Sequence, residues 1–227
     1  HRSAFGKLLI EQPLMQNVLA DLCLESEAAT TLAFRLARGF DESATEEQAK
    51  LFTRIATAIG KFWICKRAVF AASEAMEVLG GNGYVEESVL PRLYRDVPVN
   101  SIWEGSGNVQ CLDVLRSMSK ESRSVEALLN ELKSASGANI NFDNFIRAVE
   151  KELLNINDLE FRARGVVERL ALALQASALL KNAPSFVGDA FCNSRLSENN
   201  SLNFGALPVG TNVGEIINRS LPRTEEF

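Results

Sequence analysis

TEEQAKLFTRIATAIGKFWICKRAVFAASEAMEVLGG, from Thr45 to Gly81, carries the strongest structural signal in the sequence. Its first four residues have the form of a capping box, and the two glycines that close it are typical of a helix end. Between them, large apolar residues recur every three or four positions, which is the spacing of one helix face. These residues are Leu51, Phe52, Ile55, Ile59, Phe62, Val69, Met76 and Leu79. The segment therefore predicts one helix, longer than is usual in globular proteins.

A second long helix is predicted just before this one. Pro13 is tolerated in a first helical turn, and apolar residues keep helical spacing from Leu14 to Ala37. Gly39 is expected to end this helix. Two long amphipathic helices with a short link predict an antiparallel hairpin in a helical bundle.

The rest of the chain also favours helices. We expect a short helix near Ser88–Arg95, a third long helix from Ser106 to Ser119, and four further helical segments within residues 121–196. Residues 197–227 are rich in Asn, Ser, Gly and Pro, which predicts a loop or frayed tail. No strand alternation stands out. The prediction is an all-α fold: an up-and-down bundle over residues 1–120, an additional helical region over 121–196, and an irregular tail.

Composition limits the functional classes. The chain has 227 residues, 46% of them hydrophobic, and a formal net charge of −5, which gives no general basic footprint for nucleic acid. No apolar run approaches the roughly 20 residues of a membrane helix, and no signal peptide is visible. The four cysteines are far apart and form no CxxC pair, which is typical of free thiols in a reducing compartment. We therefore expect a cytoplasmic protein without a membrane partner.

The start of the sequence supports two further expectations. The only histidine is His1, which argues against histidine-based catalysis and most zinc sites, so no metal is expected. The sequence starts without Met or an introductory loop, which favours a fragment or a processed chain.

The stretch PVNSIWEGSGNVQ, Pro98–Gln110, holds the best catalytic candidate, Glu104. A carboxylate becomes a useful base near neutral pH where burial raises its pKa, and Trp103 is expected to supply a dry surface. Gly105 and Gly107 allow close approach of a ligand to the backbone. N–H groups at the start of the next helix favour a polarised oxygen. The alternative is an acid that only stabilises a helix N-terminus.

A second candidate is the glycine-rich run Gly80–Gly83, in which residue 82 is Asn. Such a run is suited to a backbone cradle for a nucleotide, and equally to a helix C-cap followed by a tight turn. Pattern alone leaves both interpretations open.

Several of these stretches, taken in order, resemble one known family. RSAFGKLL, EAMEVLGGNGYVEE, LPRLYRD and IWEGSGNVQ, together with the long helix pair, are similar to the C-terminal helical domain of the acyl-CoA dehydrogenase superfamily. The resemblance covers about residues 1–120. It is strongest to a branch that carries an additional C-terminal helical region, to which residues 121–227 correspond.

The resemblance implies a role for Glu104. In this family the glutamate of the loop is the base that removes the α-proton of an acyl-CoA thioester, while the β-hydrogen leaves as hydride to FAD. The glutamate's backbone N–H helps to polarise the thioester carbonyl. Trp103, which stands where many members have Tyr, and Gly105 would then line the substrate pocket.

The resemblance also implies FAD contacts and partners. The residues that match the family's FAD contacts are Arg2, Phe5, Gly80, Gly81, Asn82, Gly83, Ser106 and Asn108. Some of these reach FAD across a subunit contact, so a homo-oligomer is expected, a tetramer or a dimer. The family's N-terminal helical domain and middle β domain are missing from this sequence, so the chain alone is expected to be inactive.

Two other functions stay open at this point. The branch is associated with binding of double-stranded DNA and with protection against alkylation. Contacts to DNA phosphates need Lys and Arg side chains gathered on one face. Residues 121–227 hold 11 Lys+Arg and 14 Asp+Glu, a balance of 11 − 14 = −3, although Arg147, Lys151, Arg162, Arg164 and Arg169 form local groups. On the opposing interpretation these bases pair with Glu150, Glu160 and Glu168. The third function is a helical oligomerisation module whose chemical loop is idle.

Overall fold

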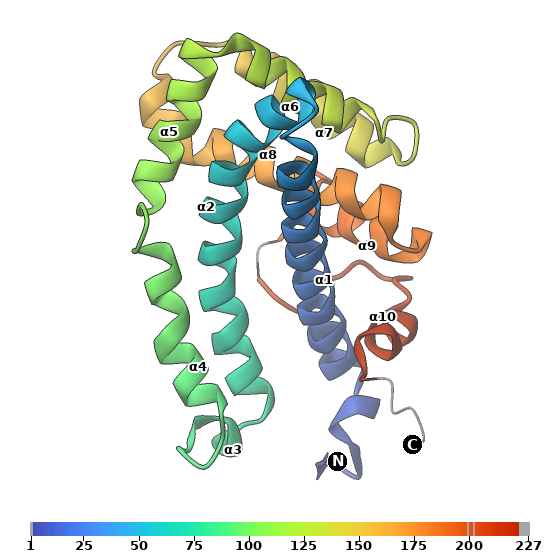
Figure 1. Ribbon diagram of the computed structural model, residues 1–227. Coiled ribbons are helices and arrows are strands. Elements are labelled where there is room, and N and C mark those ends of the chain that lie inside the picture. The colour runs from blue at the N-terminus through green and yellow to red at the C-terminus, as the bar shows by residue number, and fades with distance from the viewer. Residues whose placement is uncertain (1, 199, 202, 223–227) are drawn as a thin grey trace.

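Two long antiparallel helices, α1 (Pro13–Glu42) and α2 (Glu47–Val78), form the frame of the molecule (Figure 1). The computed structural model describes residues 2–198, 200–201 and 203–222; His1 lies outside this range. The start of α1 at Pro13 and the end of α2 just before Gly80 confirm the two boundaries predicted from proline and glycine. The predicted hairpin is therefore present.

The link between these helices differs from the prediction in two respects. Gly39 does not end α1; a side chain there would lie 2.6 Å from Thr53 Cγ2, so glycine serves close packing of α1 on α2. The prediction of a capping box at Thr45 is also wrong. Helix α2 begins at Glu47 without a side-chain cap, and the Thr45 hydroxyl donates instead to the carbonyl of Glu42 (3.3 Å).

The chain then returns along α2. A one-turn helix, α3 (Gly81–Tyr84), leads into α4 (Leu90–Asp96), the 3₁₀ helix η2 (Val97–Ser101) and α5 (Gly107–Lys120), and these three pack on α2. Figure 1 shows α4 and α5 as a column beside α2, broken by the short loop that holds Glu104. This loop therefore faces outward from the side of the bundle.

The second half of the chain closes the core. Helices α6 (Ser122–Lys133) and α7 (Ile140–Leu153) lie across one end, and α8 (Leu159–Asn182) crosses behind α1 and α2 (Figure 1). Every residue from Leu170 to Leu179 is buried, as expected for a helix surrounded by others. Helix α9 (Ser185–Arg195) packs on α8. One hydrophobic cluster joins all of these helices, and the division at residues 120 and 196 stays a prediction.

The C-terminal segment is more ordered than its composition predicts. Helix α10 (Val213–Ser220) begins after Asn212, whose side chain accepts from the Glu215 N–H, and buries Ile216 and Ile217 against the core that includes α1. The expectation of loop from residue 197 onward is therefore wrong for α10. Its two buried residues, Ile216 and Ile217, are adjacent in a helix of 8 residues, which is too short to show an apolar periodicity.

A strap of the C-terminal segment, residues 204–207, fastens this region to α1. Leu207 exchanges two hydrogen bonds with the Asn17 side chain (3.0 and 3.1 Å), and the Gly205 N–H donates to Asp21 (2.9 Å). Phe204 and Leu207 are buried. Polar side chains of α1 thus hold an extended segment far away in sequence.

Beneath this strap lies a buried ion cluster of Asp21 and Glu25 from α1, Arg67 from α2 and Arg195 from α9. Arg195 bonds to Asp21 and contacts Glu25 (3.5 Å), and Arg67 pairs with Glu25 (3.0 Å). All four side chains are less than a tenth exposed. The cluster therefore ties three helices together in the interior.

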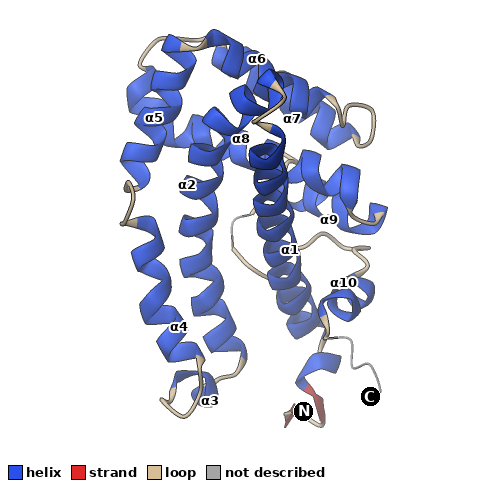
Figure 2. Ribbon diagram, viewed as in Figure 1, coloured by secondary structure: helices blue, strands red, loops and turns tan. Residues whose placement is uncertain are grey.

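Helices account for nearly all regular structure in the described residues (Figure 2). The exception is a two-stranded antiparallel ribbon, β1 (Ser3–Ala4) and β2 (Lys7–Leu8), which pairs Ser3 with Leu8 and leads through the 3₁₀ turn η1 (Leu9–Glu11) into α1. The predicted all-α class is confirmed. Among the described residues, no helix combines the length and apolarity needed to cross a membrane.

Candidate functional site

Glu104 lies in a strained loop between η2 and α5, residues 102–106, which we call the Glu104 loop. Its φ of 52° is left-handed, a conformation that is uncommon for residues other than glycine, and Gly105 follows with φ of 103°. The N–H groups of Ile102 and Trp103 both donate to the carbonyl of Val99 (2.9 and 3.1 Å). Such strain persists only where the surroundings hold it, and it clusters at functional sites.

Two side chains hold the carbonyl groups of residues 103 to 105 in the Glu104 loop. Lys61 of α2 donates to the carbonyls of Trp103 and Gly105, and Gln110 of α5 donates to those of Glu104 (3.1 Å) and Gly105 (3.2 Å). Sequence reasoning did not identify Lys61 or Gln110. No signal in the sequence marked either residue, because their partners are backbone carbonyls.

The backbone N–H of Glu104 is free. It forms no hydrogen bond with an acceptor of the described chain, whereas the carbonyls of residues 103 to 105 accept from Lys61 and Gln110. A free N–H beside a carboxylate is the pair of groups that can polarise a carbonyl and accept a proton next to it.

The dry surroundings that we expected around Glu104 are not formed by the described residues. Glu104 is exposed, and the Trp103 side chain beside it is 59% exposed. The ring lies at the surface because the loop sits on the outside of the α4–α5 column. A dry site for this carboxylate needs another surface to cover it.

A cavity of about 680 Å³ opens beside the Glu104 loop. Ser106 and Asn108 at the start of α5 line it, together with Phe70, Lys66 and Arg164. Its volume is within the range of cofactor and ligand sites. Arg164 belongs to α8, so the second half of the chain contributes to this cavity, which sequence reasoning missed because only the folded contact brings it there.

The Gly80 turn, residues 79–83, forms a second group. The Gly80 N–H donates to the Glu77 carbonyl (2.8 Å), and Gly80 has φ of 58°. These features match the interpretation of the run as a helix C-cap followed by a tight turn. The Arg2 guanidinium donates to the Leu79 carbonyl (3.1 Å), which brings Arg2 to this turn. Phe5 is 98% exposed on the nearby ribbon.

The two groups of candidate residues do not meet within one chain. Lys61 marks the position of the Glu104 loop on α2, whereas the Gly80 turn follows the last residue of α2, Val78. At 1.5 Å per residue, the helix from Lys61 to Val78 is about 25 Å long. Arg2 and the Gly80 turn therefore lie far from Glu104, Ser106 and Asn108.

Gly83 is expected to be indispensable to the Gly80 turn. A Cβ at this position would lie 2.2 Å from the Met76 carbonyl oxygen, so Gly83→Ala should lower the free energy of unfolding by about 2 kcal/mol. Gly81 is the matched control, because a Cβ there meets no atom within 4 Å, and Gly81→Ala should change stability by less than about 0.5 kcal/mol. Urea unfolding of both variants measures this; equal losses would contradict the packing argument.

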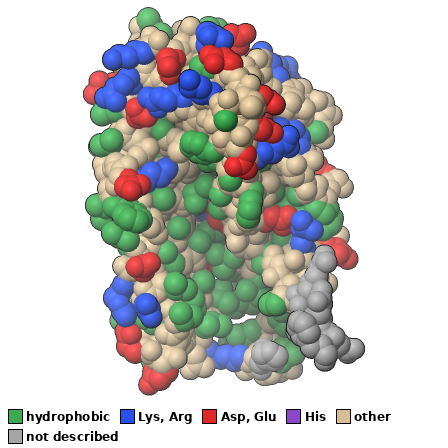
Figure 3. Space-filling view, in the orientation of Figure 1, with side chains coloured by type: hydrophobic (Ala, Val, Ile, Leu, Met, Phe, Trp, Pro, Cys, Tyr) green, Lys and Arg blue, Asp and Glu red, His purple; other side chains and the backbone are tan. Residues whose placement is uncertain are grey.

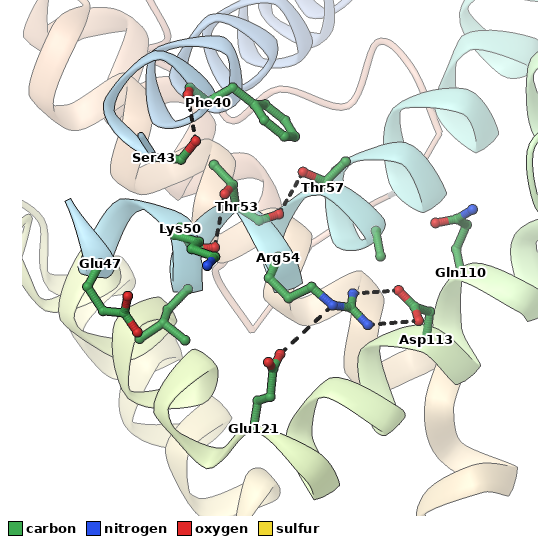
Figure 4. Close-up of a pocket in the computed structure, with 12 residues that line it drawn as sticks. Phe40, Ser43, Glu47, Lys50, Thr53, Arg54, Thr57, Gln110, Asp113 and Glu121 are labelled. Carbon is green, nitrogen blue, oxygen red and sulfur yellow. Dashed lines mark hydrogen bonds and ion pairs between the residues drawn. The ribbon is translucent and has the colours of Figure 1, made fainter. Parts of the chain in front are cut away.

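A groove of about 510 Å³ lies between the α1–α2 link and α5 (Figure 4). The Arg54 guanidinium crosses it and forms two hydrogen bonds with Asp113 (2.7 and 3.1 Å), and Glu121 lies 3.9 Å away. These bonds hold the pKa of the Asp113 carboxyl below its ordinary range. The groove is thus bridged by ion pairs, and within the described residues no group of three or more His, Cys, Asp or Glu side chains is arranged to bind a metal.

The pairing of Arg54 with Asp113 predicts a pH-dependent contribution to stability. Arg54→Met should lower the free energy of unfolding by about 1 kcal/mol at pH 7, because the pair is partly exposed. Since the pKa of Asp113 is lowered in the folded state, this stabilisation is present above about pH 4 and is lost as the pH falls through the lowered value. Urea unfolding at pH 7 and pH 3 tests this. Arg92→Met, at an exposed arginine with no ion pair in the described chain, should show no such difference.

Comparisons with known proteins agree with the fold. The family model of the acyl-CoA dehydrogenase C-terminal domain matches residues 1–119. AidB of Escherichia coli (strain K12), a protein named as an acyl-CoA dehydrogenase, is 44% identical over 195 residues, which cover 86% of this chain and 36% of AidB. The short-chain specific acyl-CoA dehydrogenase of Bos taurus mitochondria is 36% identical over 124 residues, 55% of this chain and 28% of that protein.

A solved structure is similar over most of the chain. ACDH-11 of Caenorhabditis elegans, in complex with C11-CoA, has a TM-score of 0.73 and 26% sequence identity, and the match covers 84% of this chain and 37% of that one. The chain thus spans about a third of the length of these relatives. The family model and AidB confirm the resemblance predicted from the motifs: the chain belongs to the acyl-CoA dehydrogenase family, and residues 1–119 are its C-terminal domain.

Proposed function

We propose that the full-length protein containing this chain is an FAD-dependent dehydrogenase that introduces an α,β double bond into an acyl-CoA thioester. Glu104 takes the α-proton of the thioester, and its free backbone N–H donates to the thioester carbonyl, where negative charge develops. When bound, FAD would supply the acceptor for the β-hydrogen, which leaves with its electron pair as hydride. The observation that carries this proposal is the strained, outward-facing Glu104 loop with its N–H unpaired.

The cavity beside the loop fits part of such a cofactor. Lys66 and Arg164 line it, and among the described residues no carboxylate lies within ion-pair distance of either cation. Two cations without acidic partners suit a diphosphate, and Ser106 and Asn108 offer polar contacts at the same wall. We therefore assign these side chains to FAD binding, with Trp103 and Gly105 next to the substrate.

The substrate class rests on the relatives. ACDH-11 holds C11-CoA in its structure, and the bovine relative is named for short acyl chains. Both support an acyl-CoA substrate and leave its chain length open, since Trp103 adds a large ring beside the base.

The same geometry supports the proposal of an oligomer with further domains. The exposed Glu104 needs a covering surface, which the N-terminal helical and β domains of the full-length protein would supply. Arg2, Phe5 and the Gly80 turn lie about 25 Å along α2 from Glu104. We infer that they complete the FAD site of a neighbouring subunit in a dimer or tetramer, with Gly81, Asn82 and Gly83 along the cofactor.

Flavin reduction tests the proposed function. The purified full-length protein should carry FAD and lose its flavin absorbance when mixed anaerobically with C11-CoA or a short-chain acyl-CoA. The 227-residue chain alone should bind no FAD and is the matched control. A full-length protein that binds FAD but is not reduced by any saturated acyl-CoA would contradict the proposal.

DNA binding is the alternative function, and the ion pairs weigh against it. Arg162 and Arg169 both pair with Glu152 (3.3 and 3.1 Å) rather than with the predicted acids Glu160 and Glu168. Figure 3 shows Lys and Arg mixed with Asp and Glu over the end formed by α5 and α6. Because affinity for DNA falls steeply with salt when many phosphates are neutralised, a weak salt dependence would argue against a DNA-binding face.

The third function, an oligomerisation module with an idle loop, has less support. A left-handed glutamate costs free energy, and an idle loop has no need to retain it.

A further inference from the structure

We propose that Lys61 is a positioning residue for the Glu104 base: its ammonium group, assisted by Gln110, holds the Glu104 loop in the conformation that presents the carboxylate and the free N–H together. This inference rests on the proposed function and goes beyond it, since it assigns a role to a side chain of α2 whose hydrogen bonds in the described chain go to the loop backbone.

Three successive carbonyl groups of the loop converge on two donors. The Lys61 ammonium donates to the carbonyls of Trp103 and Gly105, both at 2.5 Å, on either side of Glu104. The Gln110 amide donates to the carbonyl of Glu104 itself and shares that of Gly105. Every carbonyl from residue 103 to residue 105 therefore has a side-chain donor.

A lysine is suited to this task for two reasons. An ammonium group carries three donors, so one side chain can bond both flanking carbonyls at once. Hydrogen bonds from a charged donor are also stronger than neutral ones. They can offset the cost of the left-handed backbone at Glu104 and Gly105, which would otherwise relax.

The position of Lys61 is itself rigid. Its neighbours Phe62 and Trp63 are each 5% exposed, and the Trp63 indole donates to Gln175 of α8 (3.0 Å), so α2 cannot shift or rotate easily at this point. The loop is thus anchored to α2 through Lys61 as well as to α5 through Gln110. Catalytic groups need such support from packed elements to hold a productive geometry.

The same contacts explain why the Glu104 N–H is free. With the carbonyls of residues 103 to 105 turned toward Lys61 and Gln110, the N–H of Glu104 points to no protein acceptor. Loss of Lys61 would let the peptide groups rotate and would move the carboxylate and the N–H apart.

Lys61→Met removes the donors and keeps most of the length of the side chain. In the flavin-loaded full-length protein, we expect acyl-CoA-dependent flavin reduction to slow by about 10²-fold, the cost of a displacement near 1 Å, with KM and FAD content nearly unchanged. Lys61→Arg, which restores charged donors, should recover part of the rate. Lys50→Met is the matched control, since Lys50 is an exposed lysine of the same helix, and it should leave the rate unchanged.

Amide hydrogen exchange gives a second readout that does not need activity. The N–H groups of Ile102 and Trp103, which donate to Val99, should exchange faster in Lys61→Met than in Lys50→Met or the parent protein. Equal exchange and a flavin reduction rate within twofold of the parent would overturn the role of Lys61. If the parent protein itself is not reduced by acyl-CoA, the proposed function fails, and exchange alone decides whether Lys61 holds the loop.

Discussion

Replacing Glu104 with Gln in the flavin-loaded full-length protein is expected to slow acyl-CoA-dependent flavin reduction by about 10⁴-fold, the upper end of what a general base contributes. Gln keeps the size of the side chain and its capacity for hydrogen bonds but cannot take the α-proton. The free N–H of residue 104 and the cavity beside the loop stay in place, so FAD content and acyl-CoA binding should change little.

Glu104→Asp provides a graded comparison. The carboxylate is retained but withdrawn by one methylene, and the loop that carries it is fixed at its carbonyls by Lys61 and Gln110, so the backbone cannot follow. We expect a rate between those of the parent and Glu104→Gln. Glu87→Gln, at an exposed acid without a hydrogen bond in the described chain, should have full activity. A loss below tenfold in Glu104→Gln would remove Glu104 from the proposed role.

The sequence predicted the frame of the molecule well because that frame depends on local signals. Helices α1, α2 and α8 have long apolar faces or buried runs, and Pro13 and Gly80 mark boundaries that the backbone obeys. The Glu104 loop was likewise marked by its own residues, an acid between Trp103 and small residues. Local chemistry is sufficient to locate such a loop.

Other features depend on contacts that sequence spacing does not record. Gly39 lies inside α1 because Thr53 of α2 packs against it, and α10 packs Ile216 and Ile217 on the rest of the fold although its own segment is polar. The exposure of Glu104 likewise depends on which surfaces contact it and not on sequence spacing. A side chain is dry only where another surface covers it, and the described residues leave this one uncovered. Lys61 and Gln110 were missed because their partners are backbone carbonyls, which carry no residue signature.

The largest effect on stability is expected at Arg195 in the buried ion cluster. Arg195→Met should lower the free energy of unfolding of the 227-residue chain by about 3 to 5 kcal/mol, measured by urea unfolding at pH 7. Asp21 and Glu25 are 1% and 6% exposed, and Arg195 contacts both carboxylates. Without its guanidinium, Asp21 has no ion-pair partner in the described chain and must stay charged in the interior or draw in water.

Two further variants distinguish an uncompensated buried charge from a simple loss of packing. Arg38→Met removes an exposed pair with Glu42 on the same helix α1 and should leave the free energy of unfolding almost unchanged, because solvent screens that pair. Adding Asp21→Asn to Arg195→Met removes the uncompensated charge but leaves an oxygen to accept from the Gly205 N–H. The double variant should therefore recover part of the lost stability. If it is less stable than Arg195→Met alone, the buried charge is not the cause, and lost packing around the Arg195 side chain explains the effect instead.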